Sequence, residues 1–154
     1  MIVTAWRIVR SQHAALAFDG EGSRRYGGRW NQEGVPMVYA AESLALAALE
    51  LLVHLDASRI MQDFVCISIQ FDESLCLRID QSHLPSDWTA YPASSAVQDI
   101  GTAWFHSGES VALAVPSAIV PIEINYLINP LHPDFDNLQI GAPSAFQDDP
   151  RLKK

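Results

Sequence analysis

The residues best suited to chemistry lie in one stretch of the chain, Arg24–His54. A glycine pair, Gly27-Gly28, is followed directly by Arg29, and glycines take positive φ readily and let the backbone come close to a ligand. Every cationic residue before the C-terminal tail is an arginine, and five of these arginines lie before residue 30. A guanidinium group holds phosphate through two parallel hydrogen bonds, whereas lysine acts as a point charge. The cluster predicts a site for a small phosphorylated ligand; the alternative is a set of ordinary surface arginines.

The second candidate group is the carboxylate of Glu50, which stands in an apolar run that we expect to be a helix, Leu44–Leu55. Charged side chains are seldom fully buried unless they are paired. His54 follows four residues later, on the same helix face. Glu50 is therefore either a rim residue that reaches water and pairs with His54, or a carboxylate that faces a cleft. In the second case the other wall of the cleft carries Arg29 and the Tyr39 hydroxyl.

Two further polar side chains belong to expected strands. Arg7 lies in a predicted first strand at residues 4–9, on the face opposite Trp6. It either points into the cleft or is an exposed strand residue. Ser117 follows Pro116 at the tip of another expected strand, where ligand sites often lie. The alternative for Ser117 is a turn-forming residue after proline.

Short apolar segments must position these groups. More of these segments are typical of strands than of helices, and few βαβ units are evident, which predicts an α+β fold with a mixed, largely antiparallel sheet and flanking helices. Residues 19–23 are loop-like by composition, Trp88 is expected in surface packing, and the segments 58–63 and 141–154 are expected to be a link and a loose tail. Strands are expected at residues 4–9, 35–40, 64–71, 74–79, 111–115 and 119–127, and a second helix at 93–106.

Length and composition limit the class of protein. The chain has 154 residues, enough for one domain with a core, and we expect a single domain over residues 1–154. Its content of 49% hydrophobic and 18% charged residues is typical of a folded globular protein. No apolar run approaches the ~20 residues that span a bilayer, and the N-terminus lacks the pattern of a signal peptide. We therefore expect a cytoplasmic protein that does not enter a membrane.

Charge and cysteines narrow the expectations further. The net charge of −8 disfavours direct binding of nucleic acid, which needs a basic face. Cys66 and Cys76 lie in apolar strand-like runs and are expected to be buried thiols of a cytosolic protein, and no spacing suggests a metal site. No G-x-G-x-x-G motif follows the first strand, which argues against a Rossmann dinucleotide site.

An ordered set of motifs covers nearly the whole chain: W-R at residues 6–7, G-G-R-W-N at 27–31, V-Y-A at 38–40, A-L-E at 48–50 and V-P-S-A-I-V-P-I-E-I-N-Y-L-I-N-P-L-H-P at 115–133. In order and spacing this set resembles the RES domain family. The resemblance implies the toxin half of a RES–Xre toxin–antitoxin pair that degrades NAD, on a fold similar to ADP-ribosyltransferase toxins. It places the active-site Arg, Tyr and Glu of the family on Arg29, Tyr39 and Glu50, and associates Ser117 with the site.

The implied reaction is phosphorolysis, in which NAD and inorganic phosphate are substrates, nicotinamide and ADP-ribose 1″-phosphate are products, and no metal or prosthetic group takes part. Cleavage of the nicotinamide–ribose bond passes through an oxocarbenium-like state, which the Glu50 carboxylate would stabilise. Arg29 would hold phosphate, and Tyr39 would either stack on a ring or hydrogen-bond a phosphate. Ser117 would donate to a phosphate oxygen. The expected substrate-binding residues are Arg7, Gly28, Trp30, Asn31 and Ser117.

Other activities fit the same residues. Water as the acceptor gives an NAD glycohydrolase, a protein side chain gives an ADP-ribosyltransferase, and binding without turnover gives a nucleotide-binding module. The implied partner is an Xre-like antitoxin, which would supply any DNA binding. The sequence leaves open whether the chain is a monomer or a homo-oligomer.

Overall fold

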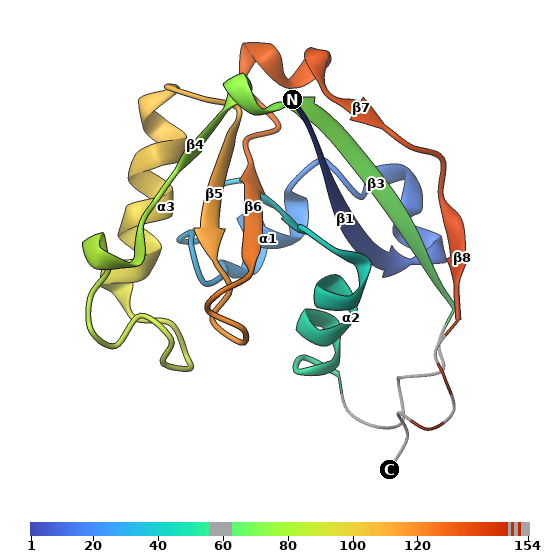
Figure 1. Cartoon of the computed structure of the whole chain (residues 1–154), viewed down its shortest axis with the longest axis horizontal. Helices are drawn as coiled ribbons and strands as arrows, with labels where there is room; N and C mark the ends of the chain where they lie inside the picture. Colours follow the sequence, from blue (N-terminus) through green and yellow to red (C-terminus); the bar gives the residue numbers. More distant parts are fainter. Residues whose placement is uncertain (56–62, 148, 150, 152–154) are drawn as a thin grey trace.

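The computed structural model describes residues 1–55, 63–147, 149 and 151. One curled sheet of eight strands forms the centre of the molecule (Figure 1). Its strands are β1 Ile2–Arg10, β2 Val38–Ala41, β3 Phe64–Asp72, β4 Cys76–Arg78, β5 Ala112–Pro116, β6 Ile124–Ile128, β7 Gln139–Ile140 and β8 Ser144–Phe146. The helices are α1 Glu21–Tyr26, α2 Leu44–Leu52 and α3 Ser95–Ser107, with 3-10 turns at Ser11–Leu16, Glu73–Leu75, Gln81–His83 and Pro133–Asn137.

The strand order is β4-β5-β6-β2-β1-β3-β7, and β8 pairs with β3 beside β7. Only the pairing of β4 with β5 is parallel among the described strands, so the expected mixed and largely antiparallel sheet is confirmed. The long antiparallel pair of β1 and β3 runs over nine residues of each strand. None of the described helices is long and apolar enough to cross a membrane.

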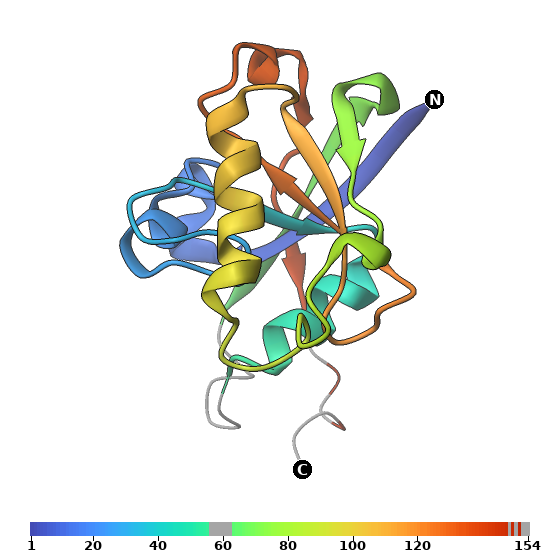
Figure 2. The same ribbon diagram turned by 90° about the vertical axis from the view of Figure 1, so that its left-hand side faces the viewer.

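Alternation along the strands divides the core between the two faces of the sheet. On β2, Val38 and Ala40 belong to one buried cluster, which also contains Ile69 and Phe71 of β3. The intervening residue Tyr39 packs against a second cluster, which contains Val97 and Trp104 of α3. Figure 2 shows α3 lying over this other face of the sheet.

Ala41 of β2 lies on the same face as Tyr39, because side chains two residues apart in a strand point the same way. It packs with Leu46 and Ala47 of α2. Helices α2 and α3 therefore both lie on one face of the sheet, and their separation along it leaves room for a cavity.

Several elements depart from the sequence-based expectations. Residues 21–26 form helix α1 rather than part of a loop, because Glu21 pairs with Arg24 and Arg25 one turn later. The helix around Glu50 ends at Leu52, and the strand expected at 119–127 begins only at Ile124.

Other corrections concern burial and the tail. Trp88 is only 8% exposed and packs in the core beneath α3, not on the surface. Ser144–Phe146, in the expected loose tail, pairs with β3. The expected link at 58–63 falls mostly outside the described residues. Cys66 and Cys76 are free thiols; Cys66 is buried, whereas Cys76 is only half-buried, and burial raises the pKa of its thiol to about 11.

Candidate active site

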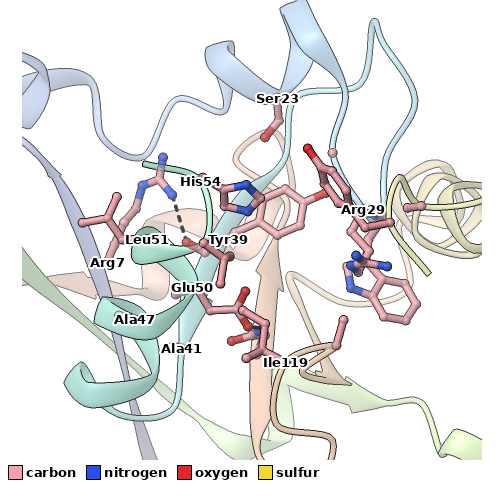
Figure 3. A pocket seen from close by; sticks show the side chains of 18 of the residues that line it. Arg7, Ser23, Arg29, Tyr39, Ala41, Ala47, Glu50, Leu51, His54 and Ile119 are labelled. Atoms are coloured by element: carbon pink, nitrogen blue, oxygen red, sulfur yellow. Dashed lines mark hydrogen bonds between the residues drawn. The ribbon is translucent and has the colours of Figure 1, made fainter. Parts of the chain in front are cut away.

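A cavity of about 900 Å³ lies on the helix-covered face of the sheet, between α2 and the loop that precedes α3. It is lined by segments far apart in the chain: β1, the end of α1 and the loop after it, β2, α2, residues 89–93 and residues 118–119. Figure 3 shows four of the lining side chains around one space, namely Arg7, Arg29, Tyr39 and Glu50. The structure thus brings together the arginines and the carboxylate that the sequence singled out.

Glu50 enters this cavity from α2, whose start is fixed by Ser43, an N-cap that accepts a hydrogen bond from the Leu46 N–H. One oxygen of the Glu50 carboxylate, Oε1, accepts hydrogen bonds from the Ser117 hydroxyl at 2.7 Å and from the Asn125 side-chain amide at 2.7 Å. Glu50 is therefore a carboxylate held in a cleft by neutral donors, and it pairs with these donors rather than with His54.

Ser117 is fully buried behind Glu50, just beyond the end of β5. Its Oγ accepts hydrogen bonds from the backbone N–H groups of Ile119 at 3.1 Å and Val120 at 3.2 Å. Because these donors occupy the acceptor side of the hydroxyl, its single proton is directed to Glu50. This geometry departs from the expected role of Ser117 as a donor to a phosphate oxygen.

Tyr39 presents its ring to the cavity and its hydroxyl to the loop after α1. The hydroxyl donates to Asn31 Oδ1 and accepts the backbone N–H of Trp30 at 3.1 Å. Burial raises the pKa of Tyr39 above its ordinary value, so the phenol stays protonated at neutral pH. A Cβ on Gly28 would lie 2.6 Å from the hydroxyl oxygen, so glycine is required there for close approach rather than for positive φ.

Asn31 does not line the cavity, whereas Trp30 borders it although almost all of Trp30 is buried. The Asn31 side chain is fully buried, and its amide donates to the carbonyls of Ser23, Gln32 and Val35 at 3.0 to 3.1 Å. Trp30 is only 2% exposed, and its side chain packs in the core beneath α3. Both residues hold the loop in shape. For Asn31 this role differs from the expected substrate contact, whereas for Trp30, at the cavity wall, that contact stays a prediction.

Arg29 is half-buried and lies at the rim of the cavity, next to the loop that contains Trp88 and Ala90. Its Nη1 donates to the carbonyls of Trp88 at 3.0 Å and Ala90 at 2.9 Å. These two bonds use both protons of Nη1, so the Nη2 and Nε donors remain for a ligand. Arg29 therefore fixes a loop with one part of its fork and is able to bind an anion with the rest.

Arg7 supplies a second guanidinium, which β1 carries into the cavity. Its Nε donates to the Ala17 carbonyl at 2.7 Å. Its Nη1 donates to the Tyr39 carbonyl at 3.0 Å, a bond marked in Figure 3. Burial lowers the pKa of Arg7, although nearby Asp19 opposes this effect; arginine remains charged in any case. Arg7 is thus a preorganised positive charge rather than an exposed strand residue.

Sequence reasoning missed two residues that line the cavity: Asn125, and Gln98, whose amide donates to the Gly28 carbonyl at 3.0 Å. It considered His54, which also lines the cavity, only as a partner of Glu50. The available signal for Asn125 was an amide within an alternating apolar strand. No sequence signal paired it with Glu50, which lies 75 positions earlier.

The chain is similar to known proteins over nearly its whole length. The family model described as the RES domain matches residues 4–149. A protein named "Toxin Res" from Yersinia enterocolitica is 40% identical over 149 residues, which cover 96% of this chain and 98% of the relative. A "Prs ADP-ribosylating toxin" from Sphingobium sp. is 36% identical over 157 residues, with coverage of 99% and 98%.

Among solved structures, a chain in the crystal structure of the M. tuberculosis MbcT–MbcA toxin–antitoxin complex superposes with a TM-score of 0.76. The match covers 99% of this chain and 87% of that chain at 21% sequence identity, so it concerns the fold. The family model and the close relatives extend over nearly the whole sequence, including the Arg29, Tyr39 and Glu50 positions. The chain therefore belongs to the RES domain family.

Proposed function

We propose that this chain is the toxin of a toxin–antitoxin pair and that it degrades NAD by phosphorolysis. The observation that carries the proposal is the Glu50 carboxylate, held through Oε1 by Ser117 and Asn125 in a cavity that also contains Arg7 and Arg29. An anionic group beside two cations suits a substrate that develops positive charge at a sugar and carries negative charge on phosphates. Relatives named as toxins support the biological role.

In the proposed reaction the bond between the nicotinamide nitrogen and C1″ of the ribose breaks. The bonding electron pair goes to the nitrogen, which turns the pyridinium into neutral nicotinamide, so this leaving group needs no proton. A phosphate oxygen forms the new bond to C1″ and gives ADP-ribose 1″-phosphate. Glu50 stabilises the positive charge that builds up on the ribose between these two events.

The arginines act on the anionic groups. The Nη2 and Nε donors of Arg29 suit bidentate binding of either the dinucleotide phosphates or the attacking phosphate. Arg7 adds a second positive charge from β1, fixed by two backbone carbonyls before a ligand arrives. Fixed donors lower the cost of reorganisation during the reaction.

A second candidate activity is ADP-ribosylation of a protein. The observation that favours it is the relative from Sphingobium, which is 36% identical to this chain and is named as an ADP-ribosylating toxin. Bond breaking would be the same, and a protein side chain would replace phosphate as the nucleophile. Hydrolysis by water is the third outcome of the same bond cleavage.

The proposed partner is an Xre-like antitoxin that carries any DNA binding, since this chain has a net charge of −8. The proposed location is the cytoplasm, where the NAD pool of the host cell is found.

Product analysis distinguishes the acceptors. The purified chain is incubated with NAD in the presence and absence of inorganic phosphate, and nicotinamide, ADP-ribose and its 1″-phosphate are separated and quantified. Phosphorolysis predicts nicotinamide release that depends on phosphate and an equal amount of ADP-ribose 1″-phosphate. Label transferred to protein would favour the transferase, and free ADP-ribose would favour hydrolysis. Binding of NAD without nicotinamide release would contradict all three.

A further inference from the structure

Asn125 lies in the middle of the sheet, next to Glu50. It lies in β6 and is paired in register with Ala41 of β2 on one side and with Val115 of β5 on the other. A residue between two paired strands has little freedom to move its backbone. The Asn125 amide nitrogen, which donates to Glu50 Oε1 at 2.7 Å, is therefore held by a rigid part of the backbone.

The two donors to Glu50 converge on one atom. Ser117 and Asn125 both donate to Oε1, and a carboxylate oxygen has about two lone-pair directions, so this oxygen is fully used. Among the residues that the structure describes, the second oxygen, Oε2, accepts no hydrogen bond. The two oxygens of Glu50 thus differ: Oε1 anchors the side chain, and Oε2 keeps its lone pairs for a ligand in the cavity that Glu50 lines.

We propose that Asn125 is a positioning residue for the reaction, which fixes the rotation of the Glu50 carboxylate so that Oε2 meets the ribose of the substrate. This inference rests on the proposed cleavage of NAD. Ser117 also donates to Oε1, but of these two donors only Asn125 lines the cavity. Displacement of a reacting group by about 1 Å can lower a rate by ~10²-fold.

The test compares Asn125→Ala with Asn125→Asp. The first removes the amide, and the second keeps its shape but replaces the N–H donor with an acceptor. For Asn125→Ala we expect kcat for nicotinamide release to fall by about 10-fold to 100-fold, with KM within about threefold of the parent, because Glu50 is misplaced mainly in the transition state. Asn125→Asp should lose at least as much, since repulsion between two carboxylates turns Glu50 away.

The matched control is Gln70→Ala, which removes an amide from an exposed position of β3, where it donates to Thr4 Oγ1 at 3.2 Å and lies outside the cavity. Its kcat should equal that of the parent, and circular dichroism with thermal melting checks that every variant is folded.

Three results would overturn the inference: a kcat within twofold of the parent for Asn125→Ala, parent-like activity of Asn125→Asp, or a large rise in KM with unchanged kcat. The first two would show that the donor is not needed, and the third that Asn125 binds substrate directly. Absence of nicotinamide release by the parent chain would instead contradict the proposed function.

Discussion

At the scale of single residues, the site shows side chains that serve the fold and the cavity at the same time. Arg29 binds two carbonyls of the rim loop with Nη1 and keeps two further nitrogens for a ligand. Tyr39 lines the cavity with its ring, while its hydroxyl holds the loop that carries Arg29. Substitutions at these positions are therefore expected to change stability and activity in different proportions.

Arg29→Lys should reduce kcat/KM for NAD cleavage by on the order of 10²-fold or more, because lysine retains the charge but loses the planar fork. It also cannot reproduce both bonds to the rim loop. Arg24→Lys is the control, since Arg24 is exposed and pairs with Glu21 on α1, outside the cavity. A mild effect at Arg29 together with a strong one at Arg24 would move the phosphate site to α1.

Tyr39→Phe should lower the free energy of unfolding by about 1–3 kcal/mol, because Asn31 Oδ1 and the Trp30 N–H both lose a partner in a buried setting. The raised pKa of Tyr39 means that this stabilisation is complete below pH ~10, the ordinary tyrosine value, and is lost only as the pH rises further. Urea unfolding at neutral pH measures the difference.

Tyr126→Phe is the control for this prediction, because among the described residues the Tyr126 hydroxyl has no hydrogen-bond partner and the ring packs edge-on against Phe71. An equal loss of stability in both variants would show that removal of any buried hydroxyl has this cost, and that the hydrogen bonds of Tyr39 to Asn31 and Trp30 do not explain the effect.

At the scale of elements, the loop after α1 is clamped between β2 and α3. Gln98 of α3 donates to the Gly28 carbonyl, and the backbone of Trp30 passes so close to α3 that a Cβ on Gly101 would lie 1.9 Å from the Trp30 carbonyl oxygen. Gly101, in the middle of the helix expected at residues 93–106, is therefore the point where loop and helix meet. The contact joins the backbone of the loop to the backbone of α3, so neither segment can move easily to make room for a side chain at Gly101.

Gly101→Ala should accordingly destabilise the protein by about 3 kcal/mol, as expected for overpacking against a backbone that cannot retreat. Gly22→Ala is the matched control: Gly22 also lies in a helix, but no atom outside that helix lies within 4 Å of an added Cβ. Alanine there should stabilise by about 0.5–1 kcal/mol. Denaturant unfolding of both variants checks this, and similar free energies of unfolding would contradict the close contact at Gly101.

The sequence predicted what depends on local pattern. The alternation of β3 and the apolar face of α3 were sufficient to place both elements, and the fold class followed from their order. Helix α1 was missed because its stability comes from pairs between Glu21 and two arginines rather than from an apolar stripe. The strand β8 was missed because its pairing partner lies about 80 positions away, in β3.

In the candidate site the motif positions of Arg29, Tyr39 and Glu50 could be named from the sequence, and all three line one cavity. Their partners could not be named. The bonds from Arg29 to Trp88 and Ala90 span 59 and 61 positions, and backbone carbonyls carry no sequence signal at all. The roles of these residues in catalysis stay predictions.

At the scale of the whole molecule, the cavity differs in charge from the protein around it. The chain carries 18 acidic residues against 10 lysines and arginines, yet two arginines line the cavity. Small anions are thus attracted locally by a protein that disfavours the phosphate backbone of nucleic acids. If the proposed antitoxin occludes the cavity, an acidic or carboxylate-ended segment of it would pair with Arg29 in place of phosphate.

The antitoxin complex is therefore expected to lose NAD binding. NAD is titrated calorimetrically into the purified complex and into the free chain, in a variant that does not turn over, so that binding alone is measured. Occlusion predicts heat of binding with the free chain and none with the complex. Equal NAD affinity in both samples would exclude occlusion and indicate inhibition from a distance.

The central claim is that the Glu50 carboxylate drives cleavage of NAD, and comparison of the parent with Glu50→Gln tests it most directly. The glutamine side chain keeps the shape, and its oxygen can still accept from Ser117 and Asn125, so the fold and the cavity should be retained. Nicotinamide release, followed with saturating NAD and phosphate, should fall by on the order of 10²-fold or more, because the negative charge that stabilises the ribose is gone. A Glu50→Gln variant that releases nicotinamide at nearly the rate of the parent would contradict the account.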